Sequence, residues 1–588
     1  EQFPLYDFSQ SGSDGISSWE QAVTGEVMPL IDSPLYRFIL FRSGEHEGGL
    51  LIKVHHIISD GWSQILLCNR IGQAYLDLLA DKKPVPEEYP DYCLHVQEEQ
   101  EYLRSKACGR DEEYWRNTLA QAGEPSLLKT EKGAAVSPVG RRISFALPES
   151  LNNAIYSFCF RNRVSPFTPF YLALAIYFKR IGGADRFTLG VPVFNRTSYR
   201  DKMTGGMFVS TLPFVNELHE EWDLEQCSRH LTEQWLEMLR HQRLPFSRIQ
   251  QLSSREGRLF RIAFSYQNSK MLNSRDASVS FSGRWHYSGY QMEQLCIHLS
   301  NLQDGCRYAV DYDYLAQLFS QKEIEQLHQR LVNILAEALA HPQRPINRLA
   351  VLSGSEKERL LYSFNSNNMP VYEEDLYERF LHNVKIHPKR AALIWNGERI
   401  NYDALERTAA QIHFHLKNKN YNPAGLTAIM LPRCPQLFAA QLGVLRSGGS
   451  FVMISPDLPR ERMADILSQS GARTLIWDSS LDYKNAPASF GLPLADMANL
   501  EDATATCQPS PMDTPAYVVY TSGSSGHPKG VAVSRGNLLN LAAAMEQVYA
   551  HGAVLSLCNT GFDAFMLESV AALLNGRTII IPNVSQLE

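Results

Sequence analysis

The sequence lacks any apolar run close to the roughly 20 residues that a membrane-spanning helix needs. Its N-terminus, residues 1–5, has neither the basic residues nor the apolar core of a secretory signal peptide. It also lacks a basic excess, because 56 lysines and arginines face 63 acidic residues. A nucleic-acid-binding protein would need a basic face. These absences predict a cytoplasmic protein that binds neither membranes nor nucleic acids.

The cysteines lack the spacing that metal sites need. Ten cysteines are spread through the chain without a C-x-x-C pair or a cysteine–histidine cluster. Reduced thiols are the simplest account of them, and we predict no metal site. What the chain does have is size. Its 588 residues, 44% hydrophobic and 20% charged, are enough for several globular domains.

The strongest catalytic signal is a histidine pair at the end of an apolar stretch. The run His55–Gly61 reads His-His-Ile-Ile-Ser-Asp-Gly, after a strand-like stretch, Gly49–Val54, and before a helix-like one, Trp62–Leu79. We expect the strand to be buried. A strand end mounts a side chain rigidly, and an imidazole with a pKa near 6.5 suits a general base at neutral pH. The run predicts a catalytic site that comprises His55, His56, Asp60 and Gly61.

Each of these residues also has a purely structural interpretation. Because side chains alternate along a strand, His55 and His56 would point to opposite faces, and one is expected to be a hydrogen-bonded core residue. Asp60 could be only the N-cap of the next helix. Gly61 could be only a turn residue that needs positive φ. The complete pattern favours a catalytic site over these separate roles.

The histidine run resembles the core motif of condensation domains of nonribosomal peptide synthetases. Six further segments resemble later motifs of that family, in the same order: Tyr89–Tyr92, Tyr114-Trp115, Gly190–Arg196, Gly206–Pro213, His241–Phe246 and Leu259–Phe264. Each segment alone would pass as ordinary strand or turn sequence. Six in the right order make coincidence implausible.

The resemblance has implications for the site. Nothing before Gly49 resembles the family's first two motifs, so we expect the chain to begin inside a condensation domain. In the family the motif aspartate pairs with an arginine of that upstream part, which implies that the partner of Asp60 lies outside the chain. Upstream and downstream peptidyl carrier domains would present donor and acceptor thioesters on phosphopantetheine arms. His56 would take the proton of the acceptor amine or orient the amine, while His55 would mainly support the fold.

Changes in composition divide the chain into regions. A polar segment, Leu128–Ala135, is expected to link two lobes, and the prolines of His341–Pro345 end a helical stretch. In the second lobe we predict one strand and three helices, over Arg142–Leu147, Ser150–Asn162, Pro166–Ile181 and Gln321–Leu339. The predicted domains are an incomplete condensation N-lobe (1–127), a C-lobe (128–345), a linker (346–370) and an incomplete adenylation domain (371–588).

A second chemical signal is a loop rich in glycine and hydroxyls. It follows an apolar strand, Ala516–Tyr520, and a helix-like segment begins near Gly536. Glycines let backbone N–H groups approach an anion, and hydroxyls and a lysine add donors and charge. The spacing is not that of a Walker A loop, and the alternative is a flexible linker. We predict that the phosphate-binding residues are Thr521, Ser522, Gly523, Ser524, Ser525, Gly526 and Lys529.

This part of the chain resembles adenylation domains of the AMP-forming ligase superfamily. The segments that carry the resemblance are Ile400–Leu405, Leu445–Phe451, Tyr520–Gly530 and Gly561–Ala564. The resemblance implies that Asp563 binds the α-ammonium of an amino-acid substrate, since leaving a buried ammonium unpaired is costly. The alternative is a surface or capping aspartate. Phe565 stands where the family often has serine, so local packing is expected to differ.

Together these resemblances imply an α/β protein with two chloramphenicol-acetyltransferase-like lobes followed by a partial adenylation N-terminal subdomain. The predicted function is peptide-bond formation between carrier-bound thioesters, beside a partial domain that activates an amino acid with ATP and Mg²⁺. We expect a monomer. One alternative is a CoA-dependent acyltransferase fused to an acyl-CoA ligase. The other is an inactive docking fragment.

Overall fold

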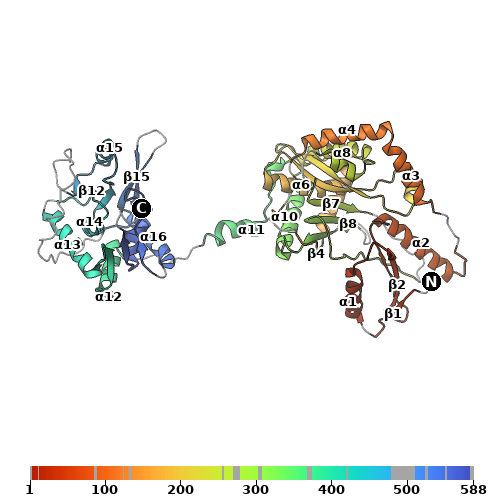
Figure 1. The fold of residues 1–588 in the computed structure, drawn as a ribbon, viewed down its shortest axis with the longest axis horizontal. Coiled ribbons are helices and arrows are strands. Elements are labelled where there is room, and N and C mark those ends of the chain that lie inside the picture. Colours follow the sequence, from red (N-terminus) through yellow and green to blue (C-terminus); the bar gives the residue numbers. More distant parts are fainter. Residues whose placement is uncertain are drawn as a thin grey trace. The chain divides into compact units, whose positions relative to one another are not determined.

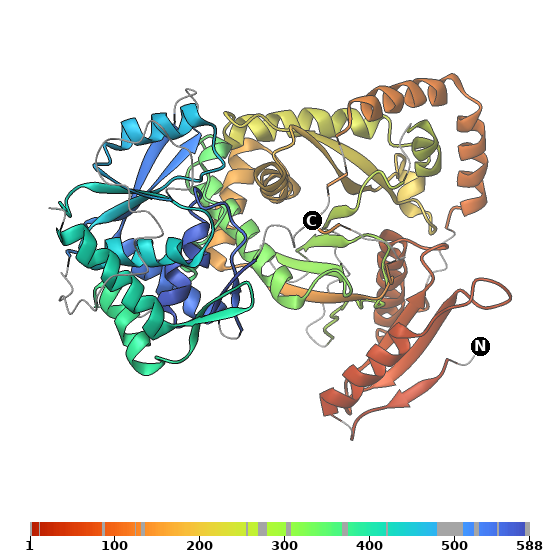
Figure 2. The same ribbon diagram turned by 60° about the vertical axis from the view of Figure 1, so that its left-hand side comes forward.

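The computed structural model divides the chain into two compact units, Glu1–Asn365 and Ser366–Glu588. Within them it describes residues 3–10, 12–84, 89–123, 125–126, 128–130, 136–253, 257–268, 279–301, 307–366, 374–418, 421–478, 510–522, 528–549 and 552–582. None of the helices in these ranges is long and apolar enough to cross a membrane. Each unit is described separately (Figures 1 and 2).

The first unit begins with a small three-stranded sheet. Its strands, in spatial order, are β1 (Leu5–Asp7), β2 (Tyr36–Arg42) and β3 (Gly48–Val54). β1 runs parallel to β2, and β2 runs antiparallel to β3. Helix α1 (Gly12–Gly25) packs on one face of this sheet, where Val23 of the helix joins Ile39 of β2 and Leu51 of β3 in a small core. β3 is therefore an edge strand in which Leu51 alone is buried, so the prediction of a buried strand before His55 is wrong.

Three helices follow the small sheet: α2 (Gly61–Leu79), α3 (Tyr92–Leu103) and α4 (Lys106–Gln121). Asp60, Asp91 and Ser105 cap them, each accepting a hydrogen bond from a backbone amide of the first turn. The buried side chains of α4, Trp115 among them, pack into the core of the next sheet rather than that of the small one. The lobe boundary at 127/128 remains a prediction, and α4, which precedes it, packs against residues that follow it.

The second sheet of this unit is the larger one. Its six strands, in spatial order, are β4 (Gly140–Ala146), β9 (Ala309–Leu315), β8 (Leu295–Ser300), β7 (Ile262–Gln267), β5 (Arg186–Val193) and β6 (Ser210–Glu217). Neighbouring strands are parallel at β5–β7 and β7–β8 and antiparallel elsewhere. The remaining helices of this part are α5 (Glu149–Asn162), α6 (Phe167–Gly182), α7 (Tyr199–Met203), α8 (Leu224–Arg240), α9 (Phe246–Leu252) and α10 (Gln321–Ala340).

One face of this sheet is covered by helices, with α6 and α10 packed against each other and α6 against β7 (Figure 1). The central part of α6, from Thr168 to Lys179, is buried. α10 begins with a capping box, in which Ser320 and Glu323 bond each other's backbone amides. The predicted strand and three helices agree with β4, α5, α6 and α10 to within two residues at each end. Their apolar periodicity explains that agreement.

The first residues of the predicted linker belong to the core of the first unit. Ile346, in a short 3₁₀ helix (Ile346–Arg348), and Leu349 are buried in that core. A short helix, α11 (Gly354–Glu358), and a π-helical turn (Arg359–Ser363) follow, and the unit ends at Asn365. The first unit therefore contains most of the predicted linker, up to Asn365.

The second unit contains two sheets. One has the spatial order β11 (Glu398–Asn401), β10 (Ala391–Trp395), β18 (Ile579–Ile581) and β17 (Val554–Leu555). The other has the order β14 (Thr474–Trp477), β12 (Leu426–Met430), β13 (Ser450–Met453), β15 (Pro515–Ser522) and β16 (Pro528–Ser534). The helices are α12 (Leu376–Ile386), α13 (Tyr402–Asn418), α14 (Pro435–Arg446), α15 (Arg460–Ser470), α16 (Arg535–Val548), α17 (Phe565–Glu568) and α18 (Val570–Leu574). α14 is almost entirely buried.

Candidate functional sites

The histidine pair lies on a turn between β3 and α2. The His55 amide donates to the Leu35 carbonyl (2.8 Å), and the Ile58 amide donates to the His55 carbonyl (3.1 Å). The Nδ1 atom of His55 accepts a hydrogen bond from the Ile57 amide (3.1 Å). His55 is half-buried rather than a core residue, whereas His56 is exposed. The backbone around His55 thus fixes the turn and leaves the His56 imidazole open to a substrate.

Asp60 holds the other end of this turn. It is the N-cap of α2, and its Oδ1 accepts hydrogen bonds from the Ser63 amide (2.9 Å) and the Ser63 hydroxyl (2.8 Å). The capping role that the sequence suggested is therefore confirmed. Gly61 begins α2 and does not have positive φ. A Cβ there would meet only Trp285 at 4.0 Å, so the backbone does not require glycine at this position.

The partner of Asp60 is Arg196, which follows β5. Its Nη1 lies 2.5 Å from Oδ2 of Asp60 and its Nη2 lies 3.0 Å from Oδ1. Both side chains are fully buried. The prediction that this arginine lies outside the chain is wrong. Arg196 belonged to a recognised motif, but 136 residues separate it from Asp60, and no local pattern in the sequence links the two.

The Asp60 carboxylate is saturated by protein donors. Besides Arg196 and Ser63, the amides of Phe208 (3.0 Å) and Val209 (3.3 Å) donate to its Oδ2. Burial alone would raise the pKa of this carboxyl, but the hydrogen bonds from Arg196, Ser63 and Phe208 outweigh burial and place the pKa below its ordinary value. Asp60 is therefore an ionised fixed point that ties the His56 turn to the segments after β5 and before β6.

The other motif segments pack around this fixed point. The Tyr92 hydroxyl donates to the Met207 carbonyl (2.7 Å), and a Cβ on Gly206 would lie 2.2 Å from the Tyr92 ring. Gly206 also has φ near +153°, so close approach and backbone both favour glycine there. The Arg196 guanidinium stacks on the Phe208 ring at 4.0 Å.

A third group joins α4 to the segment after α8. The Trp115 indole donates to the His241 carbonyl (3.0 Å), and the Tyr114 ring stacks on the His241 imidazole at 4.1 Å. Oδ1 of Asp111 lies 2.7 Å from Nδ1 of the same imidazole. The tyrosine–tryptophan pair recognised in the sequence is thus a structural anchor between elements far apart in the chain.

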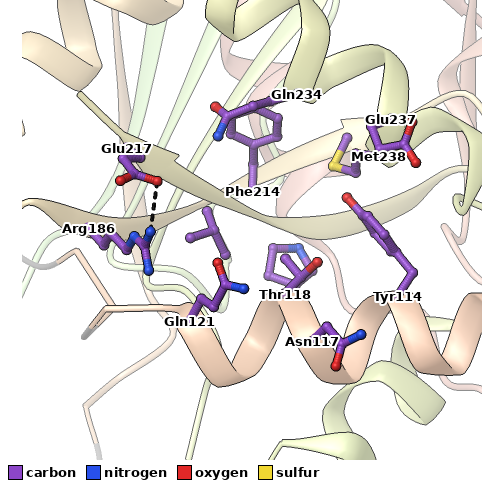
Figure 3. A pocket seen from close by; sticks show the side chains of 12 residues that line it. Tyr114, Asn117, Thr118, Gln121, Arg186, Phe214, Glu217, Gln234, Glu237 and Met238 are labelled. Atoms are coloured by element: carbon purple, nitrogen blue, oxygen red, sulfur yellow. Dashed lines mark hydrogen bonds and ion pairs between the residues drawn. The ribbon is translucent and has the colours of Figure 1, made fainter. Parts of the chain in front are cut away.

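A cavity of about 280 Å³ in the first unit lies elsewhere, between α4, the edge strand β6 and α8 (Figure 3). An ion pair between Arg186 and Glu217 (3.0 Å) closes one side. Twelve residues line it: Tyr114, Asn117, Thr118, Gln121, Arg186, Pro213, Phe214, Val215, Glu217, Gln234, Glu237 and Met238. None of the predicted catalytic residues is among them, so we do not assign the reaction to this cavity.

The predicted phosphate loop of the second unit joins β15 and β16. The two strands are antiparallel, with Thr521 opposite Lys529, and both side chains are exposed. Ser522 ends β15. Gly523, Ser524, Ser525 and Gly526 lie outside the described residues. The following helix, α16, begins at Arg535, as predicted to within one residue. The base of the hairpin thus presents a hydroxyl and an ammonium to solvent.

Asp563 lies just before α17. Its side chain is exposed, and its Oδ1 accepts a hydrogen bond from the adjacent Ala564 amide (2.8 Å). Phe565, where the family often has serine, is fully buried. Its ring lies 5.8 Å from the Phe438 ring and 5.8 Å from the Arg433 guanidinium. The aromatic ring therefore belongs to the core beneath Asp563 and leaves the carboxylate accessible.

The sequence did not reveal a buried ion pair of this unit, between Arg535 and Asp375. Arg535, fully buried, lies 3.4 Å from the carboxylate of Asp375, the N-cap of α12, and donates to the Gly449 carbonyl (2.9 Å). It thereby joins α16 and α12 to the motif that contains Gly449. Its position at the start of a predicted helix gave no sign of these partners.

The chain matches two protein-family models: "Condensation domain" over residues 3–361 and "AMP-binding enzyme" over residues 380–587. The chain belongs to the condensation-domain family. An adenylation-type region follows that domain, and the architecture is the mixed α/β one expected from the sequence.

Similar proteins carry both regions. Surfactin synthase subunit 1 of Bacillus subtilis strain 168 is 30% identical over 583 residues, which is 96% of this chain and 16% of that protein. Gramicidin S synthase 2 of Brevibacillus brevis is 26% identical over 566 residues, 94% of this chain and 12% of that protein. The chain thus spans less than a quarter of the length of these relatives.

A solved structure shows the same fold. It is a four-domain nonribosomal peptide synthetase bound to AMP and glycine, with a TM-score of 0.80 and 19% identity. The similarity covers all of this chain and 46% of that one.

Proposed function

We propose that the first unit forms an amide bond between two carrier-bound thioesters in nonribosomal peptide synthesis. The observation that carries the proposal is the turn with an exposed His56, held at its C-terminal end by the buried Asp60–Arg196 pair. A group that meets a substrate must be accessible, and its mount must be rigid. His56 meets the first condition, and the hydrogen bonds of Asp60 meet the second.

In the proposed reaction the acceptor amine attacks the donor thioester carbonyl. A C–N bond forms, the C–S bond breaks, and the thiol leaves. His56 takes the amine proton or orients the amine for attack. Asp60 and Arg196 act through the turn as positioning residues. His55 supports the turn through its backbone and its Nδ1. Peptidyl carrier domains upstream and downstream would deliver both thioesters on phosphopantetheine arms.

The test compares the two histidines. Loaded donor and acceptor carrier domains are supplied as separate proteins, and the dipeptidyl product is measured by mass spectrometry. His56→Ala should abolish transfer, a loss of at least about a hundredfold for an acid–base group, whereas His55→Ala should mainly lower stability. Full transfer by the His56 variant would contradict the proposal. Transfer from acyl-CoA without carrier domains would favour the acyltransferase alternative, and an inactive unmodified chain would favour the docking fragment.

For the second unit we propose a part in amino-acid activation by ATP. Thr521 and Lys529 supply a hydroxyl and an ammonium at the base of the hairpin, groups that suit a polyphosphate. The exposed Asp563 carboxylate suits the α-ammonium of an amino acid. Mg²⁺ would enter with the ATP as its counter-ion, and we assign it no protein ligand.

A further inference from the structure

A serine, a histidine and an aspartate lie on three neighbouring strands of the larger sheet, apart from the His56 turn. The Ser265 Oγ on β7 is 2.6 Å from Nδ1 of His298 on β8. The Nε2 of the same imidazole is 3.1 Å from Oδ2 of Asp313 on β9. Ser265 and His298 are directly opposite each other in the parallel pair β7–β8. No motif recognised in the sequence included these three residues.

The three side chains share the sheet face that α6 and α10 do not cover. Their chain neighbours Phe264, Ile297 and Tyr312 are buried in the core with those helices. Because side chains alternate along a strand, Ser265, His298 and Asp313 point the other way. Ser265 is half-buried and the His298 side chain is 22% exposed, so a small reagent can reach both.

The hydrogen bonds fix where the protons lie. Burial would raise the pKa of Asp313, but hydrogen bonds from Arg142 and His298 outweigh it and lower the pKa. The ionised carboxylate can only accept, so in the neutral imidazole Nε2 carries the proton and donates to Asp313. Nδ1 then carries no proton, and its lone pair accepts a hydrogen bond from the Ser265 hydroxyl. This is the arrangement in which a histidine activates a serine.

Asp313 is held rigidly in that role. The Nε and Nη2 atoms of Arg142 donate to its two oxygens at 2.6 and 2.8 Å. The Tyr287 ring lies 5.2 Å from the guanidinium. The Asp313 side chain is 6% exposed. Arg142 neutralises part of the carboxylate charge, so Asp313 acts mainly by orienting the imidazole.

We propose that Ser265 is a nucleophile that accepts an acyl group from an ester or thioester, with His298 as its base and Asp313 as the residue that orients His298. The Ser265 Oγ attacks the carbonyl carbon, an O–C bond forms, and the C–S or C–O bond breaks. The serine proton passes to Nδ1 of His298 and then to the leaving thiolate or alkoxide. His298 then deprotonates a water, which attacks the acyl-serine carbonyl carbon. The bond from that carbon to Oγ breaks, His298 returns the proton to Oγ, and a carboxylic acid leaves.

This activity is separate from amide formation at His56, and the test keeps the two apart. The full chain is treated with a fluorophosphonate probe, and the labelled residue is located by peptide mass spectrometry. Ser265 should be labelled, labelling should vanish in Ser265→Ala, and its rate should fall roughly a hundredfold in His298→Ala, as expected when a base is removed. His56→Ala should be labelled like the unmodified chain.

Ser144 provides the matched control. It lies on β4 two residues from Arg142, on the same face, and has no hydrogen bond to a histidine in the described part of the chain. Ser144→Ala should leave labelling unchanged, and circular dichroism checks that every variant is folded. An unlabelled Ser265 in the unmodified chain would overturn the proposal. Equal labelling in His298→Ala would also overturn it and leave the cluster as a hydrogen-bonded brace of the sheet.

Discussion

Asp60 and Asp563 were both predicted from motifs to serve a site, yet their surroundings are opposite. Asp60 is buried and accepts hydrogen bonds from an arginine, a serine and two backbone amides. Asp563 is exposed and accepts one hydrogen bond, from its own neighbour, among those described. A carboxylate saturated by protein donors has no capacity left for a substrate, whereas an exposed one does. We therefore propose that Asp60 positions the His56 turn and that Asp563 binds a substrate.

The second unit has its own positioning pair, Asp375–Arg535, in addition to Asp563. The Arg535 guanidinium lies 3.4 Å from the Asp375 carboxylate. Its Nη2 also donates to backbone carbonyls, those of Leu445 and Gly449. The Asp60–Arg196 pair is closer, with contacts of 2.5 and 3.0 Å. The two units thus contain buried aspartate–arginine pairs with different contact distances. We expect the closer pair to contribute more to the free energy of unfolding.

Arg196→Ala should have the largest effect on stability. It leaves the Asp60 charge buried without its partner, which typically costs about 3–5 kcal/mol. Because a chain of two units need not unfold in one step, the measurement is urea-dependent hydrogen exchange on peptides of α2 and β5. Arg186→Ala, at the start of β5, is the control. Its partner Glu217 is about one-third exposed, so that variant should lose at most about 1 kcal/mol.

Asp563→Ala should instead lower function and leave the fold intact. Exposed substitutions usually change stability by less than about 0.5 kcal/mol, whereas an unpaired substrate ammonium should cost roughly 3 kcal/mol or more. Amino-acid-dependent exchange of pyrophosphate into ATP, measured in the complete adenylation domain, should therefore fall more than about a hundredfold. The corresponding acid without its amino group should lose little. Unchanged activation of amino acids would make Asp563 a structural residue.

Arg535→Ala should destabilise the second unit by about 2–3 kcal/mol, less than Arg196→Ala, because hydrogen bonds of a charged group are typically worth about 1.5–3 kcal/mol. Faster hydrogen exchange in α12 and α16 would report the loss. Arg407→Ala, which breaks an exposed pair with Asp403 on α13, is the control and should change exchange little. A larger loss than in Arg196→Ala would reverse the ranking.

The smallest expected effect is a dependence on pH. Because folding lowers the pKa of Asp60, the unfolded state takes up a proton on this carboxylate at a higher pH than the folded state does. Its contribution to stability is complete above about pH 4 and is lost as pH falls through the lower folded-state pKa. The stability gap between the unmodified chain and Arg196→Ala should therefore narrow as the pH falls below about 4. A gap that widens would show that the Asp60 pKa is not lowered by Arg196.

Local patterns in the sequence predicted local structure well. The bounds of α5, α6 and α10 followed from apolar periodicity, and the capping role of Asp60 followed from its place before α2. The expected buried strand before His55 failed, because an apolar composition does not show whether a strand lies at the edge of its sheet. The Asp60–Arg196 and Asp375–Arg535 pairs could not be predicted, since tertiary folding alone brings their partners together.

A double-mutant cycle on Asp60 and Arg196 tests the central claim most directly. The free energy of unfolding of the first unit is measured for Asp60→Asn, Arg196→Met and the double variant. If the pair is the fixed point of the His56 turn, the double variant should be at least about 2 kcal/mol more stable than the sum of the single losses implies, since residues in one buried network couple by roughly 0.5–3 kcal/mol. Losses that add to within about 0.5 kcal/mol would contradict the account.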